Sequence, residues 1–221
     1  MFLKISLKNS ELLGIYMNLT NKYLIIPNKN NIKEEIIFKD IFKKNIRIIN
    51  TSIGESSLIG SLSIGNDKGL IISNLLIRRE FLFIRRNLPK DITIVPLQLS
   101  FNNPSAVLSV NNNLLLTSIN HRKIIIQNFN SILKCKCLIL NNINFTIDKY
   151  NFPMNNFCAL TSQISDKIAL ILSSIIQMPI FCIEYYNNYN LIGSNFVLND
   201  RVFIFGKTFN LEWLKNIRCV I

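Results

Sequence analysis

Turn-forming asparagines recur along the chain at a nearly constant spacing, and each leads into a short apolar run. They are Asn21, Asn66, Asn111, Asn155 and Asn199. The intervals are about 45 residues, in the range where an internal repeat defines the whole architecture. The tetrapeptide Leu-Ile-Gly-Ser also occurs twice, at residues 58–61 and 191–194, each time just before one of these turns. The sequence therefore predicts five copies of one structural unit.

Each copy combines strand patterns with one amphipathic helix pattern. In the first copy, segments 2–7, 12–18 and 23–26 are expected to be strands, and apolar residues at helical spacing predict a helix over 32–41. In later copies, apolar segments predict strands at 46–51, 58–64, 70–73, 92–99, 106–110, 114–118, 137–140, 145–148, 157–160, 180–184, 191–198 and 202–205. Further helices are expected at 75–87, 121–133, 164–176 and 210–217.

The predicted fold class is α+β, with five strand-strand-strand-helix units in one domain. The units span approximately residues 1–44, 45–89, 90–135, 136–178 and 179–221. Because such a unit cannot bury its apolar face alone, it must pack on its neighbours. We therefore expect a closed ring, with sheets around a central axis and helices outside.

The charge balance is strongly basic. The 25 Lys and Arg residues against 13 Asp and Glu residues give a net charge of +12. Such a surplus favours polyanions such as RNA, because bound counterions are released on association. A nucleotide bias toward Asn, Ile and Lys codons explains the same surplus without selection for binding, and both interpretations stay open here.

No segment predicts a membrane span or a targeting signal. The longest apolar region, residues 168–183, is short and contains Ser173, Ser174 and Pro179. The N-terminal segment carries Lys4 and Lys8 where a signal peptide needs an unbroken apolar stretch. We expect a protein of the cytoplasm and the nucleus.

The cysteines do not form a pattern that holds a metal ion or a disulfide framework. There are five, Cys135, Cys137, Cys158, Cys182 and Cys219, with no Cys-x-x-Cys spacing and a single histidine in the chain. We expect buried thiols and no cofactor.

Several motifs together resemble the ribosome anti-association factors called translation initiation factor six. They are Leu19-Thr20-Asn21-x-Tyr23, Ser52-Ile53 with Ile59-Gly60 and Gly65-Asn66-x-x-Gly69-Leu70, Ile84-Arg85-x-x-Leu88-Pro89, Ser173-Ser174-Ile175-Ile176-Gln177-x-Pro179 and Val197-x-Asn199-Asp200. The resemblance covers the whole chain. It implies a pentein fold, which is a five-bladed, pseudo-fivefold αβ propeller and agrees with the unit count.

The resemblance also implies a function without catalysis. A member of this family is expected to be a monomer that binds the intersubunit face of the large ribosomal subunit. There it contacts a bridge-forming ribosomal protein near the sarcin-ricin loop, blocks joining of the small subunit, and takes part in large-subunit biogenesis and export. A GTPase and its cofactor are expected to release it, and the nucleolus is an expected location.

In the family, the ribosomal contacts lie near the positions of Ser61 and Ala106. Stepping these positions by the repeat adds Tyr16, Asn151 and Asn195, which predicts one contact residue per unit. The family tends to have Arg where Ser61 stands and Gly-Asn where Ser105 and Ala106 stand. These departures predict a changed partner or weaker binding. Ser173 and Ser174 match a serine pair that is regulated in animal members, which makes them candidate phosphorylation sites.

Two other functions compete with this one. Pentein enzymes that hydrolyse guanidino groups use a Cys near the C-terminus and a His, and this chain has Cys219 and His121. A general basic RNA-binding protein is the other alternative. Arg78, Arg79, Arg85 and Arg86 on one predicted helix form either a phosphate-binding stripe or a solvated outer face.

Overall fold

Strands in the computed structural model form five small sheets. The structure describes residues 1–28, 32–42, 45–97, 102–118, 123–140, 146–162, 164–183 and 191–207. The sheets contain β2 (Asn18–Leu19), β3 (Tyr23–Pro27) and β4 (Arg47–Thr51); β5 (Ser63–Gly65), β6 (Gly69–Ile72) and β7 (Thr93–Pro96); β8 (Ser109–Val110), β9 (Leu114–Thr117) and β10 (Lys136–Ile139); β11 (Ala159–Thr161) and β12 (Ile180–Cys182); and β13 (Phe196–Leu198), β14 (Phe203–Gly206) and β1 (Phe2–Ile5).

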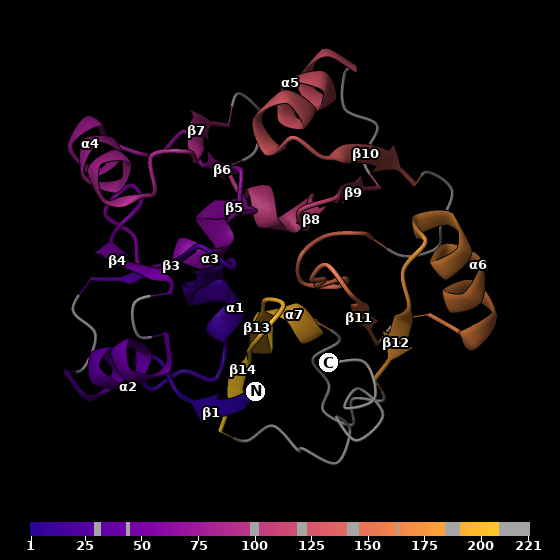
Figure 1. Ribbon diagram of the computed structural model, residues 1–221, viewed down its shortest axis with the longest axis horizontal. Coiled ribbons are helices and arrows are strands. Elements are labelled where there is room, and N and C mark those ends of the chain that lie inside the picture. The colour runs from indigo at the N-terminus through magenta and orange to yellow at the C-terminus, as the bar shows by residue number, and fades with distance from the viewer. Residues whose placement is uncertain are drawn as a thin grey trace.

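One pairing order is shared by these sheets. An antiparallel hairpin such as β2–β3 is followed by a helix, and the next strand returns parallel to the second hairpin strand. In the sheet of β11 and β12, an isolated bridge between Met154 and Ala159 takes the place of the first strand. The helices α2 (Ile32–Phe42), α4 (Arg78–Asn87), α5 (Lys123–Leu133) and α6 (Asp166–Ile176) make these crossovers and lie on the outside (Figure 1).

The two ends of the described chain meet in one sheet. β1 runs parallel to β14, with Phe2 opposite Phe203 and Ile5 opposite Gly206. The N-terminal amine also donates to the carbonyl of Arg201 over 2.8 Å. The first strand of the chain thus completes the last hairpin, and the sheets close around a common centre (Figure 1).

The predicted mixture of helices and strands is confirmed, but the predicted strand order differs. Segment 46–51, expected to begin the second unit, instead pairs as β4 with β3 of the hairpin before it. The apolar segments 12–18, 58–64, 106–110 and 191–198 each begin with a single helical turn rather than with a strand. These turns are α1 (Leu13–Tyr16), α3 (Ile59–Leu62), η1 (Pro104–Ala106) and α7 (Ile192–Asn195). Residues 146–148 form no strand, and the helix expected at 210–217 lies outside the described residues.

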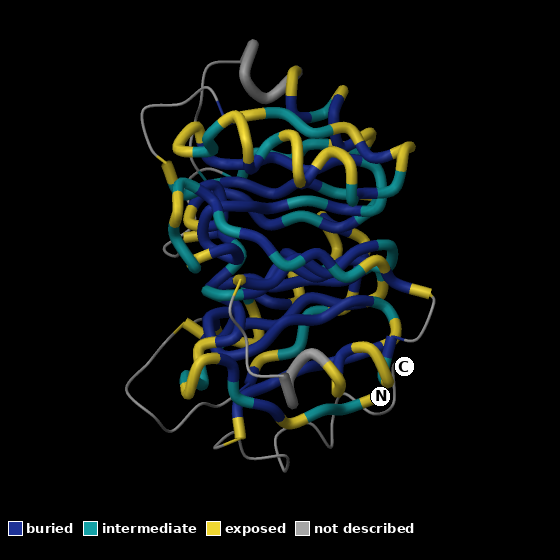
Figure 2. The backbone as a smooth tube through the Cα atoms, turned by 90° about the vertical axis from the view of Figure 1, so that its left-hand side faces the viewer, coloured by how far each residue is buried: buried dark blue, intermediate teal, exposed yellow. Residues whose placement is uncertain are grey.

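The hydrophobic core lies between the sheets and the outer helices. Strand residues such as Ile25 and Leu115 have no exposed surface, while the outer helices expose one side (Figure 2). Phe38 and Phe42 of α2 stack with ring centroids 6.4 Å apart, and Ile84 of α4 is fully buried. Each such side chain contributes about 1.5–3 kcal/mol on burial. Among the described residues, no helix has the length and apolar character needed to span a membrane.

Close backbone packing explains why single helical turns replace the expected strands. A Cβ atom added to Gly14 would lie 1.8 Å from the carbonyl oxygen of Gly193. One added to Gly60 would lie 2.1 Å from the carbonyl oxygen of Gly14. The turns α3, α1 and α7 therefore contact each other backbone to backbone near the centre, which only glycine permits at these positions.

We expect Gly14→Ala to lower the free energy of unfolding by about 2–3 kcal/mol, because the added methyl group must displace backbone atoms of α7. Gly206→Ala is the comparison and should cost less, because its added methyl group meets the side-chain carboxylate of Glu11 first and the Glu11 carbonyl oxygen only at 2.9 Å. Denaturant unfolding of both variants would measure the difference. Equal losses would show that the central packing is not specially tight.

Candidate functional site

The hairpin turns are held by one repeated pattern of hydrogen bonds. The side-chain oxygen of Asn66 accepts the backbone N–H groups of Lys68 and Gly69, at 2.9 and 3.0 Å. Its side-chain amide donates to the carbonyl of Asn111, the same position in the next turn, over 3.0 Å. Asn111 donates in the same way to Asn155, and Asn155 to Asn199. Each asparagine thus shapes its own turn and binds the next one.

Threonine takes this position in the first turn. Thr20 Oγ1 accepts the backbone N–H groups of Lys22 and Tyr23, each at 3.1 Å, and the Thr20 carbonyl accepts the amide of Asn199 at 3.0 Å. The predicted repeat had placed Asn21 in register with Asn66. That alignment is wrong by one residue, because the hydroxyl oxygen of Thr20 accepts the two backbone N–H groups that an asparagine side-chain oxygen accepts in the other turns.

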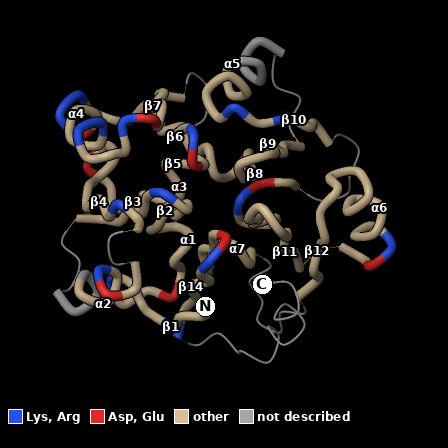
Figure 3. The backbone as a smooth tube through the Cα atoms, in the orientation of Figure 1, with Lys and Arg blue, Asp and Glu red and all other residues tan. Residues whose placement is uncertain are grey.

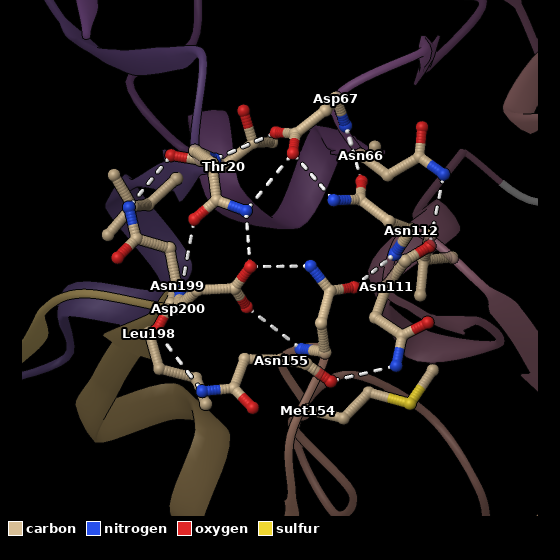
Figure 4. A pocket seen from close by; sticks show the side chains of 15 residues that line it. Thr20, Asn66, Asp67, Asn111, Asn112, Met154, Asn155, Leu198, Asn199 and Asp200 are labelled. Atoms are coloured by element: carbon tan, nitrogen blue, oxygen red, sulfur yellow. Dashed lines mark hydrogen bonds between the residues drawn. The ribbon is translucent and has the colours of Figure 1, made fainter. Parts of the chain in front are cut away.

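The next residue in each turn belongs to a second circle of hydrogen bonds, which we call the turn ring (Figure 4). Its members are Asn21, Asp67, Asn112, Asn156 and Asp200. Each backbone N–H donates to the side-chain oxygen of the following member, over 2.8–3.0 Å, and Asp200 returns the relay to Asn21. Three side-chain amides point at two carboxylates, so donors and acceptors match.

A partly buried lysine, Lys149, lies at the other end of the hairpins with its ammonium directed inward. The ammonium of Lys149 donates to the carbonyls of Gly60, Met17 and Gly14 over 2.9, 3.2 and 3.3 Å. Between it and the turns is a cavity of about 50 Å³, lined by the first hairpin strands and by Lys149. Burial lowers the pKa of Lys149 to about 7. The three carbonyl acceptors favour the charged form and hold the amine across the centre.

The molecule therefore has two different ends along the hairpins. Each first strand begins after a single helical turn and finishes at a ring turn, so the two sets of residues lie at opposite ends. We call them the helical face and the turn face. The four single helical turns contain no charged residue. The turn face carries Lys22, Lys68 and Arg201 at three hairpin tips.

The helical face exposes apolar side chains at related positions. Leu12, Leu58 and Leu191 precede α1, α3 and α7, and their surfaces are 37%, 39% and 43% exposed. The loop before α3 is anchored by Glu80 of α4. Its carboxylate accepts from Ser52 Oγ at 2.6 Å and from the N–H groups of residues 54, 55 and 77. Burial raises the pKa of Glu80, but these bonds outweigh it and the net pKa is lowered.

The five predicted contact residues all lie at the helical face or just inside it. Ala106 is exposed and Tyr16 is partly buried. Ser61, Asn151 and Asn195 are only 8%, 4% and 8% exposed. Ser61 accepts a hydrogen bond from the hydroxyl of Tyr150 at 2.7 Å, which links the sheet of β5 to the sheet of β11, two sheets further along the chain. Their role as contact residues stays a prediction, and the leucines beside them are the side chains that reach solvent.

Other predicted residues are scattered over the molecule. Ser173 is partly buried and Ser174 is exposed on α6, where their hydroxyls donate to the carbonyls of Met178 and Ile171. The four arginines of α4 are exposed, and Arg79 forms an ion pair with Glu55 at 2.5 Å. Cys219 and His121, the candidate catalytic pair, both lie outside the described residues.

Solved structures of dimethylarginine dimethylaminohydrolase share the fold of this chain. The chain superposes on dimethylarginine dimethylaminohydrolase (DDAH) from Pseudomonas aeruginosa, complexed with citrulline, with a TM-score of 0.56 and 9% identity, covering 91% of this chain and 90% of that one. A second DDAH structure, an adduct with S-methyl-L-thiocitrulline, gives 0.52 with 10% identity over 83% and 70% of the two chains. These likenesses show that the chain belongs to the class of proteins with the pentein fold.

The sequence identifies the family within this class. Residues 2–208 match the model of the eIF-6 family, and the chain belongs to that family. A relative named eukaryotic translation initiation factor 6 from Entamoeba dispar is 24% identical over 211 residues, 90% of this chain and 84% of its own length. The Guillardia theta relative of the same name is 34% identical over 111 residues, half of this chain and 49% of that protein. The resemblance to this family is confirmed.

We expect Asp200→Asn to lower the free energy of unfolding by about 2 kcal/mol, although the two side chains have the same shape. All three groups that face the carboxylate are donors, namely the backbone N–H and the amide of Asn156 and the amide of Asn21. An asparagine amide must therefore set a donor against a donor. Asp40→Asn, on the exposed side of α2, is the control in denaturant unfolding, and an equally small loss for both would contradict the matched ring.

We expect the stability difference between the wild type and Lys149→Met to change with pH. The folded pKa of Lys149 is about 7, and the unfolded value is near 10.4, so between them the unfolded chain binds more protons. The free energy of unfolding of the wild type should rise relative to the variant from pH 7 to pH 10. Urea unfolding across this range tests it, with exposed Lys167→Met as the control. A constant difference would mean that the amine is not desolvated.

Proposed function

We propose that this protein is a non-catalytic ribosome anti-association factor that binds the large ribosomal subunit through its helical face. Family membership supports a role in translation initiation, since the relatives carry that name. The proposed mechanism is steric: the bound protein occupies the intersubunit surface and prevents the small subunit from joining. It acts as a monomer in the cytoplasm and nucleus, takes part in large-subunit biogenesis, and is released by a GTPase and its cofactor.

The observation that carries this proposal is the chemistry of the helical face. Exposed Leu12, Leu58 and Leu191 surround turns without charged residues. Uncharged faces with apolar side chains are typical of the centres of protein–protein interfaces, whereas nucleic acids require cations. The intended partner of this face is therefore the protein component of the joining surface, the bridge-forming ribosomal protein near the sarcin-ricin loop.

A steric mechanism also requires a rigid protein. We propose that the five sheets are the five blades of a pseudo-fivefold pentein propeller. The closed relay of the turn ring and the backbone contacts of Gly14, Gly60 and Gly193 support this assignment. Because hydrogen bonds and backbone contacts fix the hairpins at both ends, the bound protein should keep its shape when a small subunit collides with it. An interface of at least about 1,000 Å² then suffices for stable occupancy.

We expect Leu58→Asp and Ala106→Arg, each at the helical face, to weaken co-sedimentation with purified large subunits at least tenfold. Both positions are exposed, so the thermal melts should stay within a few degrees of the wild type. The control is Leu170→Asp on α6, where the leucine is 73% exposed far from this face in the fold. A subunit-joining assay in the same buffer would follow the loss of inhibition.

Three outcomes separate the possibilities. Weakened binding by the two helical-face variants but not by the control supports the proposal. Unchanged binding by both would place the interface elsewhere on the molecule. Equal binding of the wild type to both subunits, or to neither, would refute the anti-association role itself. Asn195 is not substituted in this test, because it is buried and a large side chain there would disturb α7.

A further inference from the structure

A basic groove opens at the margin of the turn face, away from the helical face. It is lined by Lys22 at the first hairpin tip, Lys39 in the last turn of α2, Arg47 at the start of β4, and the apolar side chains of Ile46, Ile48 and Pro89. Its volume is about 630 Å³, within the range of ligand sites in proteins. Three of its lining residues are cations and none is an acid.

The groove is held in shape by backbone contacts between neighbouring units. The N–H of Arg47 donates to the carbonyl of Lys22 at 2.9 Å, which fixes β4 beside the first hairpin tip. The guanidinium of Arg47 donates through Nε to the carbonyl of Asn87 at 3.1 Å, which orients it from the end of α4. Asp91 pairs with the ammonium of Lys22 from the following loop. Lys22 and Arg47 are therefore placed by the fold, and Asp91 offsets the charge of Lys22.

The surroundings of the groove carry charges of both signs. Arg201 at another hairpin tip is exposed, and the ammonium of Lys68 lies 2.9 and 3.0 Å from the carbonyls of Asn112 and Lys134. The carboxylates of Asp67 and Asp200 in the turn ring accept hydrogen bonds from neutral amides and keep their negative charges. Figure 3 shows that Lys and Arg segments near the centre of the molecule and on α2 lie beside Asp and Glu segments. The excess of cations at this margin of the turn face is therefore confined to the groove and its edge.

We propose that this groove binds the phosphate backbone of RNA, as a second interaction surface independent of the helical face. Arg and Lys side chains in this arrangement bind phosphate oxygens without reading a base sequence. The apolar floor of Ile46, Ile48 and Pro89 offers a surface for ribose and base. Because the groove and the helical face lie at different ends of the hairpins, one molecule can bind RNA while it occupies a large subunit.

The test uses the full chain and a 20-nucleotide single-stranded RNA, with binding measured by fluorescence anisotropy at several salt concentrations. The variant Lys39→Glu/Arg47→Glu should bind at least tenfold more weakly. Its slope of log K against log salt should fall by about 1.4, the contribution of two phosphate contacts to a single strand. Lys39→Arg/Arg47→Lys keeps the charges and should bind RNA much as the wild type does.

Arg78→Glu/Arg86→Glu on α4 is the matched control, because it makes the same change in net charge at exposed positions outside the groove. It should retain affinity within about threefold and keep the wild-type salt slope. Equal losses in the two double variants would overturn the proposal in favour of a general charge effect. An unchanged affinity in Lys39→Glu/Arg47→Glu would overturn it as well, as would equal displacement of the RNA by polyglutamate, which points to an acidic protein partner.

Co-sedimentation of Lys39→Glu/Arg47→Glu with large subunits separates this inference from the proposed function. Binding should be unchanged there, and the thermal melt should match the wild type. A loss of large-subunit binding would show that the groove is part of the ribosomal interface and would refute the claim that it is a separate surface. If the helical-face variants bind large subunits as the wild type does while the groove variants lose RNA binding, the proposed ribosomal interface is refuted and the RNA-binding groove is supported.

Discussion

A relay of hydrogen bonds from each hairpin turn to the next sets the positions of the sheets. Four links join an asparagine side chain of one turn to the backbone of the next, and the N–H of Asn21, which donates to Asp67, joins the remaining pair of turns. A turn therefore cannot move without breaking bonds to its neighbours. The asparagine side-chain links are buried, and a buried donor or acceptor left without its partner costs about 1–3 kcal/mol. At the opposite end, glycine contacts and the Lys149 ammonium impose the same kind of constraint. The sheets and outer helices are arranged around these two layers.

The two ends differ in chemistry although they belong to the same hairpins. Residues before each first strand are small or apolar, which allows backbones to meet and leaves leucines at the surface. Residues at the tips are polar or cationic, because turn geometry needs amide and hydroxyl acceptors and the next position is free to vary. Repetition of one unit therefore places apolar side chains at one end and polar and charged side chains at the other, without any separate domain. Association through the first should depend weakly on salt, and through the second steeply.

The sequence predicts the parts of the fold that rest on local chemistry. The asparagine spacing indicated repeated units, and the helical stripes located α2, α4, α5 and α6 within a few residues. The sequence-based prediction was wrong where long-range contacts determine the local conformation. An apolar segment such as 58–64 fits a strand by pattern, and only the approach of Gly14 shows why it starts as a helical turn.

Two features of the site were also out of reach of pattern analysis. Thr20 accepts the turn N–H groups that an asparagine accepts in the other turns. Lys149 is partly buried with its ammonium directed inward, whereas its residue type predicts an exposed side chain. The leucines of the helical face were missed for a related reason. A leucine in an apolar run is expected to be buried, and only the position of Leu12, Leu58 and Leu191 beside the single helical turns brings them to the surface.

The pairing of β1 with β14 has a consequence for synthesis of the chain. The amine of the first residue bonds to a carbonyl 200 residues later, so the last sheet cannot form until translation has passed the second strand of the final hairpin. Contacts of such sequence separation slow folding, because a very long loop must close first. Until then β1 presents an unpaired apolar edge, which favours pairing with other chains. We therefore expect chaperones to bind the nascent chain while β1 is still unpaired.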